Sequence, residues 1–358
     1  MIPRGIAILL TYRCNFRCRH CAIEASKLRK ESLDREYIRK AIDEISEFPT
    51  VKVVSFTGGE PTLEMSNLKW AISYASKKGL ITRLVTNGWW ATDFNRALDI
   101  LSELKQMGLK EFNMSFGDFH LPYLGDEMKI VYAIKAAKEL GLRCAIATVK
   151  AKGSKIDVPY IIKLLKKGSI DISDIFFVTD YVTPVGRGRS IPEKSLVYDR
   201  RPLDIGCFEI LRYISVHPNG EVRLCCGQSM LEVPELLGGN IKRDRISDII
   251  REAQQNILYW WLFIRGPKGI LEYLNCRANR KFVNICDECR YLFTKCRKQL
   301  YRKIKEDKYE IILYQLLESD LLKRLKKAYD LVSEDMRTLK MWLTKSAASD
   351  NQSKDFSN

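Results

Sequence analysis

Three cysteines fall within eight residues in the segment Cys14-Asn15-Phe16-Arg17-Cys18-Arg19-His20-Cys21, which directly follows an apolar run. Thiolates at this spacing can converge on one metal centre, and they favour zinc or iron–sulfur over hard cations. Three protein ligands leave one metal position open, as in a catalytic site, whereas a structural site is closed by a fourth ligand. A structural zinc knuckle is the alternative, but its fourth ligand would be His20, which is adjacent to Cys21. The segment therefore predicts a metal centre with an open position.

The composition of the chain excludes several classes of protein. Its 358 residues include 11 Cys and 3 His, carry a formal net charge of +16, and are 46% hydrophobic and 29% charged. Such a chain is neither disordered nor fibrous, and it is long enough for one large or two ordinary domains. No apolar run approaches the ~18 residues that span a bilayer, and no signal peptide is recognised, so we expect a cytoplasmic protein. Because cytoplasmic thiols are usually reduced, eleven cysteines suggest metal ligation more than disulfides.

The first half of the chain alternates short apolar runs with amphipathic stretches. The predicted strands are 5–12, 51–56, 81–86, 111–116, 143–149 and 172–182, and the predicted helices are 34–47, 65–78, 92–107, 127–140 and 156–167. Strict alternation predicts a parallel sheet with right-handed crossovers. In such sheets the chemistry lies at the carboxyl ends of the strands, and the three cysteines follow the first strand.

The pattern changes near residue 185, after which the sequence predicts a hairpin and then helices. Residues 211–216 and 221–224 flank His217-Pro218-Asn219-Gly220, and Asn-Gly is a strong hairpin signal. The aromatic run at 257–264 is expected to be a core helix rather than a membrane-contacting or substrate-contacting face. A basic helical segment is expected at 301–345 and a disordered polar tail at 346–358.

The spacing Cys-x3-Cys-x2-Cys after a first strand resembles the signature of the radical S-adenosylmethionine (SAM) superfamily. The resemblance implies that Cys14, Cys18 and Cys21 hold a 4Fe–4S cluster whose unique iron binds SAM. It also implies that an electron from this cluster cleaves SAM to a 5′-deoxyadenosyl radical, which abstracts hydrogen from the substrate. His20 stands where the family prefers an aromatic residue.

A second motif, Thr57-Gly58-Gly59-Glu60-Pro61, follows the second predicted strand. Glycines at a strand end let backbone groups approach a ligand closely, although most Gly-Gly pairs are only turns. At this place the motif resembles the one with which the family binds the amino group of SAM. The resemblance implies cofactor contacts from Gly58, Gly59, Glu60 and Pro61.

Further polar residues follow the third and fourth predicted strands. In the family, polar groups at these places often contact SAM, which here implies Asn87 and Ser115. Helix capping and turn chemistry are the alternative. Asp118 and His120 follow the fourth strand and are the candidate catalytic pair, as a proton acceptor or to orient the substrate. The alternative for this pair is a capped loop with a solvent-exposed histidine.

Seven more cysteines lie in the second half, namely Cys207, Cys225, Cys226, Cys276, Cys286, Cys289 and Cys296. A hairpin end together with a Cys-x2-Cys pair would also suit a zinc ribbon. The order of these cysteines resembles the SPASM/twitch extension of radical SAM enzymes, and the seventeen-residue gap before Cys225 resembles its one-cluster form. The resemblance implies an auxiliary 4Fe–4S cluster held by Cys207, Cys225, Cys286 and Cys289. Cys226, Cys276 and Cys296 stay unassigned, and Cys144 is expected in the core.

The expected architecture is α/β. It comprises a partial (β/α)6 TIM-like barrel of the radical SAM type at 1–190, a small SPASM/twitch-like domain at 191–300, and the C-terminal helices. The resemblance implies a radical SAM oxidoreductase or maturase with SAM and two 4Fe–4S clusters, the auxiliary one accepting an electron. A ribosomally made peptide or protein is the expected substrate. Because the chain begins at the first strand, we expect no N-terminal peptide-recognition domain, so small-molecule dehydrogenation or cofactor biosynthesis stays open.

The basic excess is distributed along the chain, and it fits anionic clusters, an acidic substrate or a reductant such as ferredoxin or flavodoxin. No RNA- or DNA-binding module is recognised, so neither a nucleic acid nor a membrane is the expected partner. A zinc-knuckle nucleic-acid-binding protein without catalysis is the hypothesis from another class.

Overall fold

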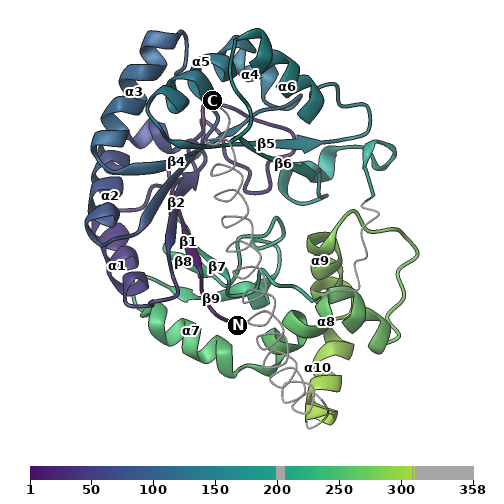
Figure 1. The fold of residues 1–358 in the computed structure, drawn as a ribbon. Helices are drawn as coiled ribbons and strands as arrows, with labels where there is room; N and C mark the ends of the chain where they lie inside the picture. Colours follow the sequence, from purple (N-terminus) through teal and green to yellow (C-terminus); the bar gives the residue numbers. More distant parts are fainter. Residues whose placement is uncertain (199–205, 309, 311–358) are drawn as a thin grey trace, which may run out of the picture. The chain divides into compact units, whose positions relative to one another are not determined.

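The computed structural model describes residues 1–198, 206–308 and 310, and the chain divides into two compact units, Met1–Ile304 and Lys305–Asn358. Within the described part of the first unit, nine strands form one sheet in the order β6-β5-β4-β3-β2-β1-β7-β8-β9 (Figure 1). The strands are β1 (Gly5–Thr11), β2 (Val53–Gly58), β3 (Ile81–Thr86), β4 (Leu109–Ser115), β5 (Arg143–Lys150), β6 (Phe176–Tyr181), β7 (Tyr213–Val216), β8 (Glu221–Arg223) and β9 (Leu237–Asn240).

Helices alternate with the first six strands, which pair in parallel, and lie along the outer side of the sheet in Figure 1. The helices are α1 (Arg35–Ser46), α2 (Met65–Lys77), α3 (Phe94–Gln106), α4 (Leu121–Leu124), α5 (Met128–Glu139) and α6 (Val158–Lys167). Each strand and helix predicted for this half is present, with bounds that differ by a few residues. The prediction of a partial (β/α)6 barrel is confirmed.

Strand β1 lies inside the sheet and carries the cysteine segment to its carboxyl edge. All seven of its residues are buried, and it pairs in parallel with β2 on one side and β7 on the other. A parallel strand covered on both faces needs a nearly continuous apolar sequence, which the residues of β1 supply. Gly5 begins the strand where a Cβ atom would lie 2.4 Å from the ring of Tyr213. The segment that follows β1 is therefore held at the middle of the sheet edge.

The predicted hairpin is confirmed, since β7 and β8 pair antiparallel around His217-Pro218-Asn219-Gly220. Two of its features were not predicted. Strand β7 continues the barrel sheet by pairing with β1, and β9 pairs with β8 although its sequence, Leu237-Gly238-Gly239-Asn240, has no apolar alternation. One sheet thus contains strands from both sides of residue 190, and the domain boundary placed there stays a prediction.

The aromatic run belongs to helix α8 (Ile257–Tyr273), which buries Leu258, Tyr259, Trp261 and Leu262 and confirms the core assignment. It lies between α7 (Ile246–Gln255) and α9 (Ile285–Lys295), and α10 (Arg297–Glu306) is the last described helix. The rest of the helical segment expected at 301–345 and the tail expected at 346–358 lie outside the described residues, apart from 307, 308 and 310. None of the helices described is both long and apolar enough to cross a bilayer.

A buried hydrogen-bonded chain connects the end of β1 to the hairpin. The hydroxyl of Tyr12 lies 2.7 Å from His217 Nδ1, and Ser215 Oγ lies 3.0 Å from His217 Nε2. Ser215 Oγ also donates to the carbonyl oxygen of Cys225. His217 is fully buried, and burial lowers its pKa to about 3, so the ring is neutral in the folded protein.

We expect the buried His217 in this hydrogen-bonded network to make the folded protein acid-sensitive. His217 in the unfolded chain takes up a proton near pH 6.5, whereas the folded protein resists it down to about pH 3. The free energy of unfolding should therefore decrease as pH falls from 6.5, by at most about 1.4 kcal/mol per pH unit from this residue. Urea unfolding at pH 7, 6 and 5 should show a smaller decrease in His217→Gln. An equal decrease in both proteins would contradict the assignment.

Candidate active site and cluster-binding cysteines

A cavity of about 150 Å³ lies at the carboxyl ends of β1, β2, β3 and β4. Eight of the residues predicted for the site line it, namely Cys14, Cys18, Cys21, Gly58, Gly59, Asn87, Ser115 and His120. The parallel topology explains this convergence, because the residues that follow neighbouring strands meet at one edge of the sheet. The cavity is therefore the candidate active site.

The cysteine segment supplies thiols that are poorly solvated. Cys14 and Cys18 are buried, and burial raises the pKa of each thiol to about 12. For Cys18, the neighbouring thiols of Cys21 and Cys14 contribute to this rise after burial. The amide N–H of Phe16 donates to Cys14 Sγ at 3.4 Å, and the Asn87 side-chain amide lies 3.8 Å from the same sulfur. A bare thiolate is unfavourable here, whereas a metal group would supply the positive charge that stabilises it.

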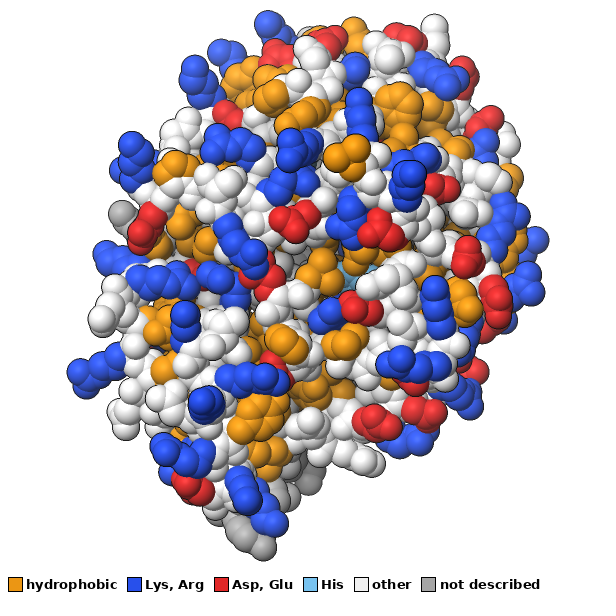
Figure 2. All heavy atoms as spheres, turned by 180° about the vertical axis from the view of Figure 1, so that it is seen from behind, with side chains coloured by type: hydrophobic (Ala, Val, Ile, Leu, Met, Phe, Trp, Pro, Cys, Tyr) orange, Lys and Arg blue, Asp and Glu red, His pale blue; other side chains and the backbone are white. Residues whose placement is uncertain are grey.

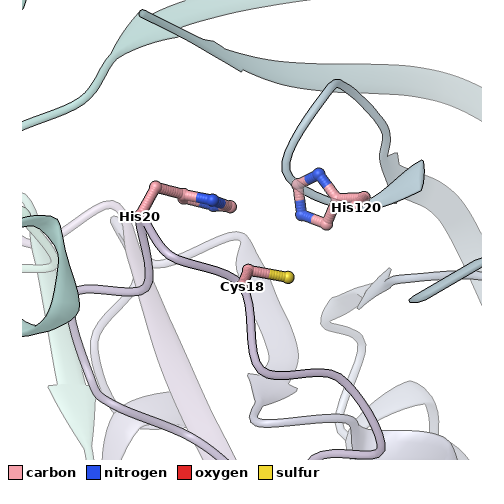
Figure 3. Close-up of side chains that lie close together, drawn as sticks. All are labelled: Cys18, His20 and His120. Carbon is pink, nitrogen blue, oxygen red and sulfur yellow. The ribbon is translucent and has the colours of Figure 1, made fainter. Parts of the chain in front are cut away.

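Two histidines stand beside Cys18 in the same cavity. Ligand atoms of Cys18, His20 and His120 all lie within 4.8 Å of one another, and Figure 3 shows the three side chains turned toward a common space. Burial lowers the pKa of His20 to about 3 and that of His120 to about 4, so both rings are neutral. Among the residues described, neither Nδ1 atom has a hydrogen-bond partner. Both nitrogens are therefore buried polar atoms beside the cavity that the described residues leave unsatisfied.

The two glycines after β2 let the backbone of the cysteine segment pass close by. A Cβ atom on Gly59 would lie 2.2 Å from the Arg13 carbonyl oxygen, and one on Gly58 would lie 2.4 Å from that of Thr11. Gly58 also has φ +133°, which side chains with a Cβ rarely adopt. The amide of Gly59 donates to Thr11 O at 2.7 Å. The Gly-Gly pair thus fixes the start of the cysteine segment as well as lining the cavity.

Glu60 is placed differently from its neighbours Gly58 and Gly59. Its fully buried carboxylate accepts four hydrogen bonds, from the amides of Thr62 and Asn87 and the hydroxyls of Thr62 and Thr86, at 2.6–3.1 Å. Burial raises the pKa of Glu60, and these bonds act in the opposite direction. Neither Glu60 nor Pro61 lines the cavity. Their direct contact with a cofactor stays a prediction that this placement does not support.

The candidate catalytic pair is separated by the structure. His120 lines the cavity and is only 7% exposed, so the alternative of a solvent-exposed histidine is wrong. Asp118 is not part of the cavity lining, and its two carboxylate oxygens accept the backbone amides of Lys155 and Ile156 at 2.9 Å. Asp118 therefore anchors the segment that follows β5, and His120 is the member of the pair that can meet a ligand.

Sequence reasoning missed Arg187, which also lines the cavity. Its guanidinium donates to the carbonyl oxygens of Cys18 at 2.9 Å and Ala25 at 2.8 Å, and its amide donates to Cys21 O. It comes from the 3₁₀ helix η2 (Gly186–Ser190), in the basic glycine-rich connection after β6. The only signal was its place after the sixth strand. Arg187 adds a fixed positive charge beside the thiols.

The four cysteines predicted for an auxiliary cluster come together from three parts of the chain. Cys207 precedes β7, Cys225 follows β8, and Cys286 and Cys289 lie at the start of α9. A Cβ on Gly227 would lie 3.0 Å from Cys286 Sγ and 3.8 Å from Cys225 Sγ. The pKa of Cys289 is raised well above its usual value by burial, then by Cys207, Cys225 and Cys286. The arrangement brings four thiols to one place, of which Cys225 and Cys289 are buried and Cys207 and Cys286 are partly exposed.

The spacing of the sulfur atoms bears on which metal group they fit. In the described parts of the chain, no three cysteine sulfurs lie within 4.8 Å of one another. Thiolates on one tetrahedral zinc ion would be only ~3.8 Å apart, given Zn–S bonds of about 2.3 Å. In an iron–sulfur cluster each thiolate binds a different iron, so the thiolates lie farther apart. The all-thiol donor sets of both cysteine groups are ligands that iron–sulfur clusters take.

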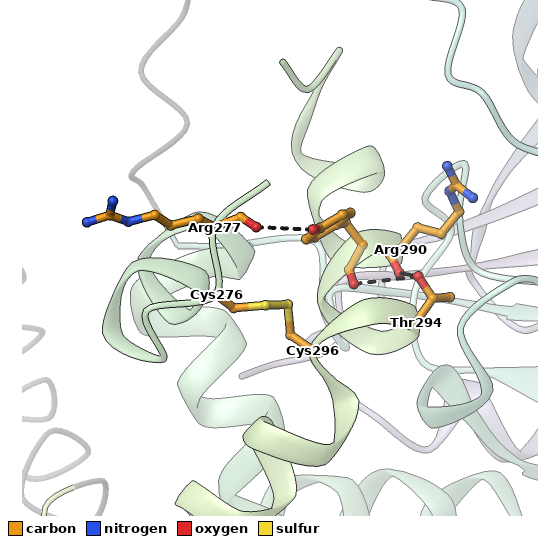
Figure 4. The surroundings of a disulfide bond; sticks show 6 residues. Cys276, Arg277, Arg290, Thr294 and Cys296 are labelled. Carbon is orange, nitrogen blue, oxygen red and sulfur yellow. Dashed lines mark hydrogen bonds between the residues drawn. A yellow bond between two sulfur atoms is a disulfide. The ribbon is translucent and has the colours of Figure 1, made fainter. Parts of the chain in front are cut away.

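The remaining cysteines divide into three kinds. Cys276 and Cys296, which were unassigned, form a disulfide with a Cα–Cα distance of 6.2 Å, beside the hydrogen bond from Tyr291 OH to Arg277 O (Figure 4). The expectation that metal ligation outweighs disulfides is therefore wrong for this pair. Cys144 is buried in β5 as predicted, and Cys226 is exposed.

Comparison with known proteins agrees with these two groups of cysteines. Residues 8–165 match the model of the radical SAM superfamily, and residues 207–290 match the SPASM iron–sulfur cluster-binding domain. The chain is 22% identical over 327 residues to the putative peptide biosynthesis protein YydG of Bacillus subtilis, covering 86% of this chain and 98% of that protein. It is 29% identical over 180 residues to the PqqA peptide cyclase of Bradyrhizobium diazoefficiens, covering 48% and 44%. Among solved structures, anSMEcpe with bound AdoMet and Cp18Cys peptide aligns with a TM-score of 0.49 at 14% identity, covering 85% and 100%.

Proposed function

Because this chain belongs to the radical SAM superfamily and carries a SPASM iron–sulfur cluster-binding domain, we propose that it cleaves SAM reductively and modifies a peptide or protein. The observation that carries the proposal is the cavity in which the thiols of Cys14, Cys18 and Cys21, the first two of them buried, meet the two glycines, Asn87 and His120. The peptide substrate is supported by the relatives, one named a peptide biosynthesis protein and the other a peptide cyclase.

The residues of this chain fit the cofactors that the family implies. Cys14, Cys18 and Cys21 would hold the catalytic 4Fe–4S cluster, and the four cysteines near Gly227 would hold the auxiliary one. When bound, the cluster and SAM supply one-electron chemistry that removes a hydrogen atom from the substrate. The buried thiols, the exclusion of water and the charge of Arg187 are what the protein itself contributes.

His120 would contact the molecule that reacts. Nδ1 of its neutral ring is buried beside the cavity, has no partner among the described residues, and could donate or accept one hydrogen bond. It would orient the substrate or move a proton at this atom, while His20 packs against its ring at 4.9 Å between centroids. Asn87 Nδ2, which donates to Asn15 Oδ1 at 3.0 Å, would keep the cysteine segment in place beside it.

Replacement of His120 tests this role. His120→Ala should lower the rate of substrate modification by about 100-fold, a usual contribution of a positioned acid–base group. The bound iron should not change, because His120 is not among the proposed thiol ligands. Asp118→Asn is the matched control, since Asp118 follows the same strand but lies outside the cavity, and its rate should stay within a few-fold of the wild type. A wild-type rate in His120→Ala would exclude the role.

The proposed function is tested with protein purified and reconstituted without oxygen. We expect brown protein with about eight iron atoms, which corresponds to two four-iron clusters. With dithionite and SAM it should release 5′-deoxyadenosine, measured by mass spectrometry. Deuterated peptides encoded by short neighbouring reading frames should transfer deuterium into that product. Colourless protein with stoichiometric zinc would overturn the proposal in favour of the zinc-knuckle hypothesis. If deuterium entered 5′-deoxyadenosine only from a deuterated small molecule, the dehydrogenase alternative would be favoured.

A further inference from the structure

An apolar groove of about 340 Å³ lies beside the cysteine segment. Most of its lining residues have no role in the proposed chemistry. It is lined by Asn15, Phe16, Arg17, Ser26, Lys27, Leu28 and Tyr123. Leu28 is 88% exposed and Tyr123 is 43% exposed, so the groove leaves apolar surface in contact with water. Apart from Phe16, these residues are not part of the lining of the active-site cavity. The groove is thus a separate surface next to the catalytic cluster site.

The groove is rigidly joined to the cluster ligands. The rings of Phe16 and Tyr123 stack with centroids 5.6 Å apart, and the Tyr123 hydroxyl donates to the Arg17 carbonyl oxygen at 2.7 Å. Phe16 and Arg17 are the residues between Cys14 and Cys18. On the other side, Ser26 accepts a backbone hydrogen bond from the Cys14 amide at 3.1 Å. A protein seated in the groove would be separated from the cluster ligands by a single layer of this segment.

The groove has a cationic rim. Residues 13–30 contain six Lys or Arg and one acidic residue, Glu24. Arg13 and Arg29 are paired with Glu64 and Glu31, whereas Arg17 and Lys27 are exposed and form no ion pair with any residue described. Lys and Arg are also widespread over the face of the molecule seen in Figure 2, so charge alone does not single out a surface. What distinguishes this place is unpaired positive charge around an apolar groove at the cluster segment.

We propose that this groove docks an acidic one-electron carrier protein, which reduces the catalytic cluster; the proposal rests on the proposed function. One electron passes from the reduced carrier to the oxidised cluster, the carrier is oxidised by one electron, and no bond is made or broken. A small apolar centre with a charged rim is typical of brief redox encounters, which bury less than about 1,200 Å². Opposite charges steer such encounters and make their rate sensitive to salt.

The test uses reconstituted full-length enzyme and an acidic flavodoxin as the probe. Two variants change the groove: Arg17→Gln/Lys27→Gln removes the unpaired charges, and Leu28→Asp puts a like charge opposite the carrier. Leu28 lies outside the cysteine segment, so this variant remains informative if the double variant loses iron. The control is Lys166→Gln/Lys167→Gln, which removes two exposed lysines at the end of α6, a helix that does not line the groove.

Three measurements are compared: binding of oxidised flavodoxin by calorimetry at low and moderate salt, cluster reduction by reduced flavodoxin, and cluster reduction by dithionite. We expect the groove variants to bind flavodoxin about 10-fold more weakly, equivalent to about 1.4 kcal/mol, and to be reduced correspondingly slowly by it. In the double variant, flavodoxin binding should also depend less on salt concentration than in the wild type. Dithionite should reduce all variants at the wild-type rate, and the control should resemble the wild type throughout.

Two outcomes overturn the proposal. One is unchanged flavodoxin binding and reduction in both groove variants. The other is a raised KM for a peptide substrate with dithionite as reductant and unchanged flavodoxin binding, which would make the groove a peptide site. Failure of the proposed function looks different. The wild type would then release no 5′-deoxyadenosine even with dithionite, while the binding measurement would still report on the groove.

Discussion

Cys18→Ser is expected to abolish release of 5′-deoxyadenosine and to remove about four of about eight bound iron atoms. Cys18 is buried in the active-site cavity, next to Cys14 and Cys21 and within 4.8 Å of His20 and His120. A serine hydroxyl is a far poorer ligand for iron than a thiolate, and no other described thiol lines that cavity besides these three. Iron analysis and the electron paramagnetic resonance spectrum of the reduced protein would measure the loss.

A matched pair of variants separates the two clusters. Cys289→Ser should also lose about four iron atoms but should still cleave SAM, because Cys289 belongs to the other cysteine group. Cys144→Ala removes a buried thiol in β5 that belongs to neither group, and it should keep all the iron. If Cys18→Ser retained full iron and SAM cleavage, the assignment of the catalytic cluster would be wrong.

Glu60→Ala is expected to lower the free energy of unfolding by about 2–4 kcal/mol, because it leaves the buried amides of Thr62 and Asn87 without acceptors. Glu60→Gln should lower the free energy of unfolding by less. Its amide oxygen can still accept a hydrogen bond, although its NH₂ group would face a hydrogen-bond donor. Urea unfolding followed by tryptophan fluorescence would measure both.

The same variants distinguish a structural role of Glu60 from a direct contact with SAM. If Glu60 mainly joins β2 to β3, the free energy of unfolding should fall in both variants. SAM binding should then weaken only as far as the folded fraction of the protein decreases. If it contacts SAM directly, Glu60→Gln should weaken SAM binding while the unfolding curve stays unchanged. The second result would contradict the placement of the carboxylate outside the cavity.

Much of the fold could be predicted because its signals are local. Alternating apolar and amphipathic stretches reveal parallel strands and their helices, and Asn219-Gly220 marks a hairpin whatever surrounds it. Parallel topology then brings the segments after β1 to β4 to one edge, so Cys18, Gly59 and Asn87 could be expected together. The cysteine spacing added the metal chemistry.

Other features depend on contacts between distant residues, which no local pattern carries. Strand β7 pairs with β1 across more than 200 residues, and Arg187 reaches the carbonyl of Cys18 from the connection after β6. Cys276 and Cys296 are joined because the end of α8 packs beside the end of α9. The sequence could count these cysteines but could not say which ones meet.

The amino-acid sequence of this protein establishes which residues reach the carboxyl edge of the sheet. Short local patterns are enough to place the strands in order and to identify the side chains that follow them. Which of them face the cavity was decided by folding alone. Glu60 and Asp118 turn away to satisfy backbone amides, and His120 lines the cavity with an Nδ1 that bonds no described residue. The direction of each side chain follows from the hydrogen-bond donors that tertiary packing places around it, since buried polar groups must be satisfied.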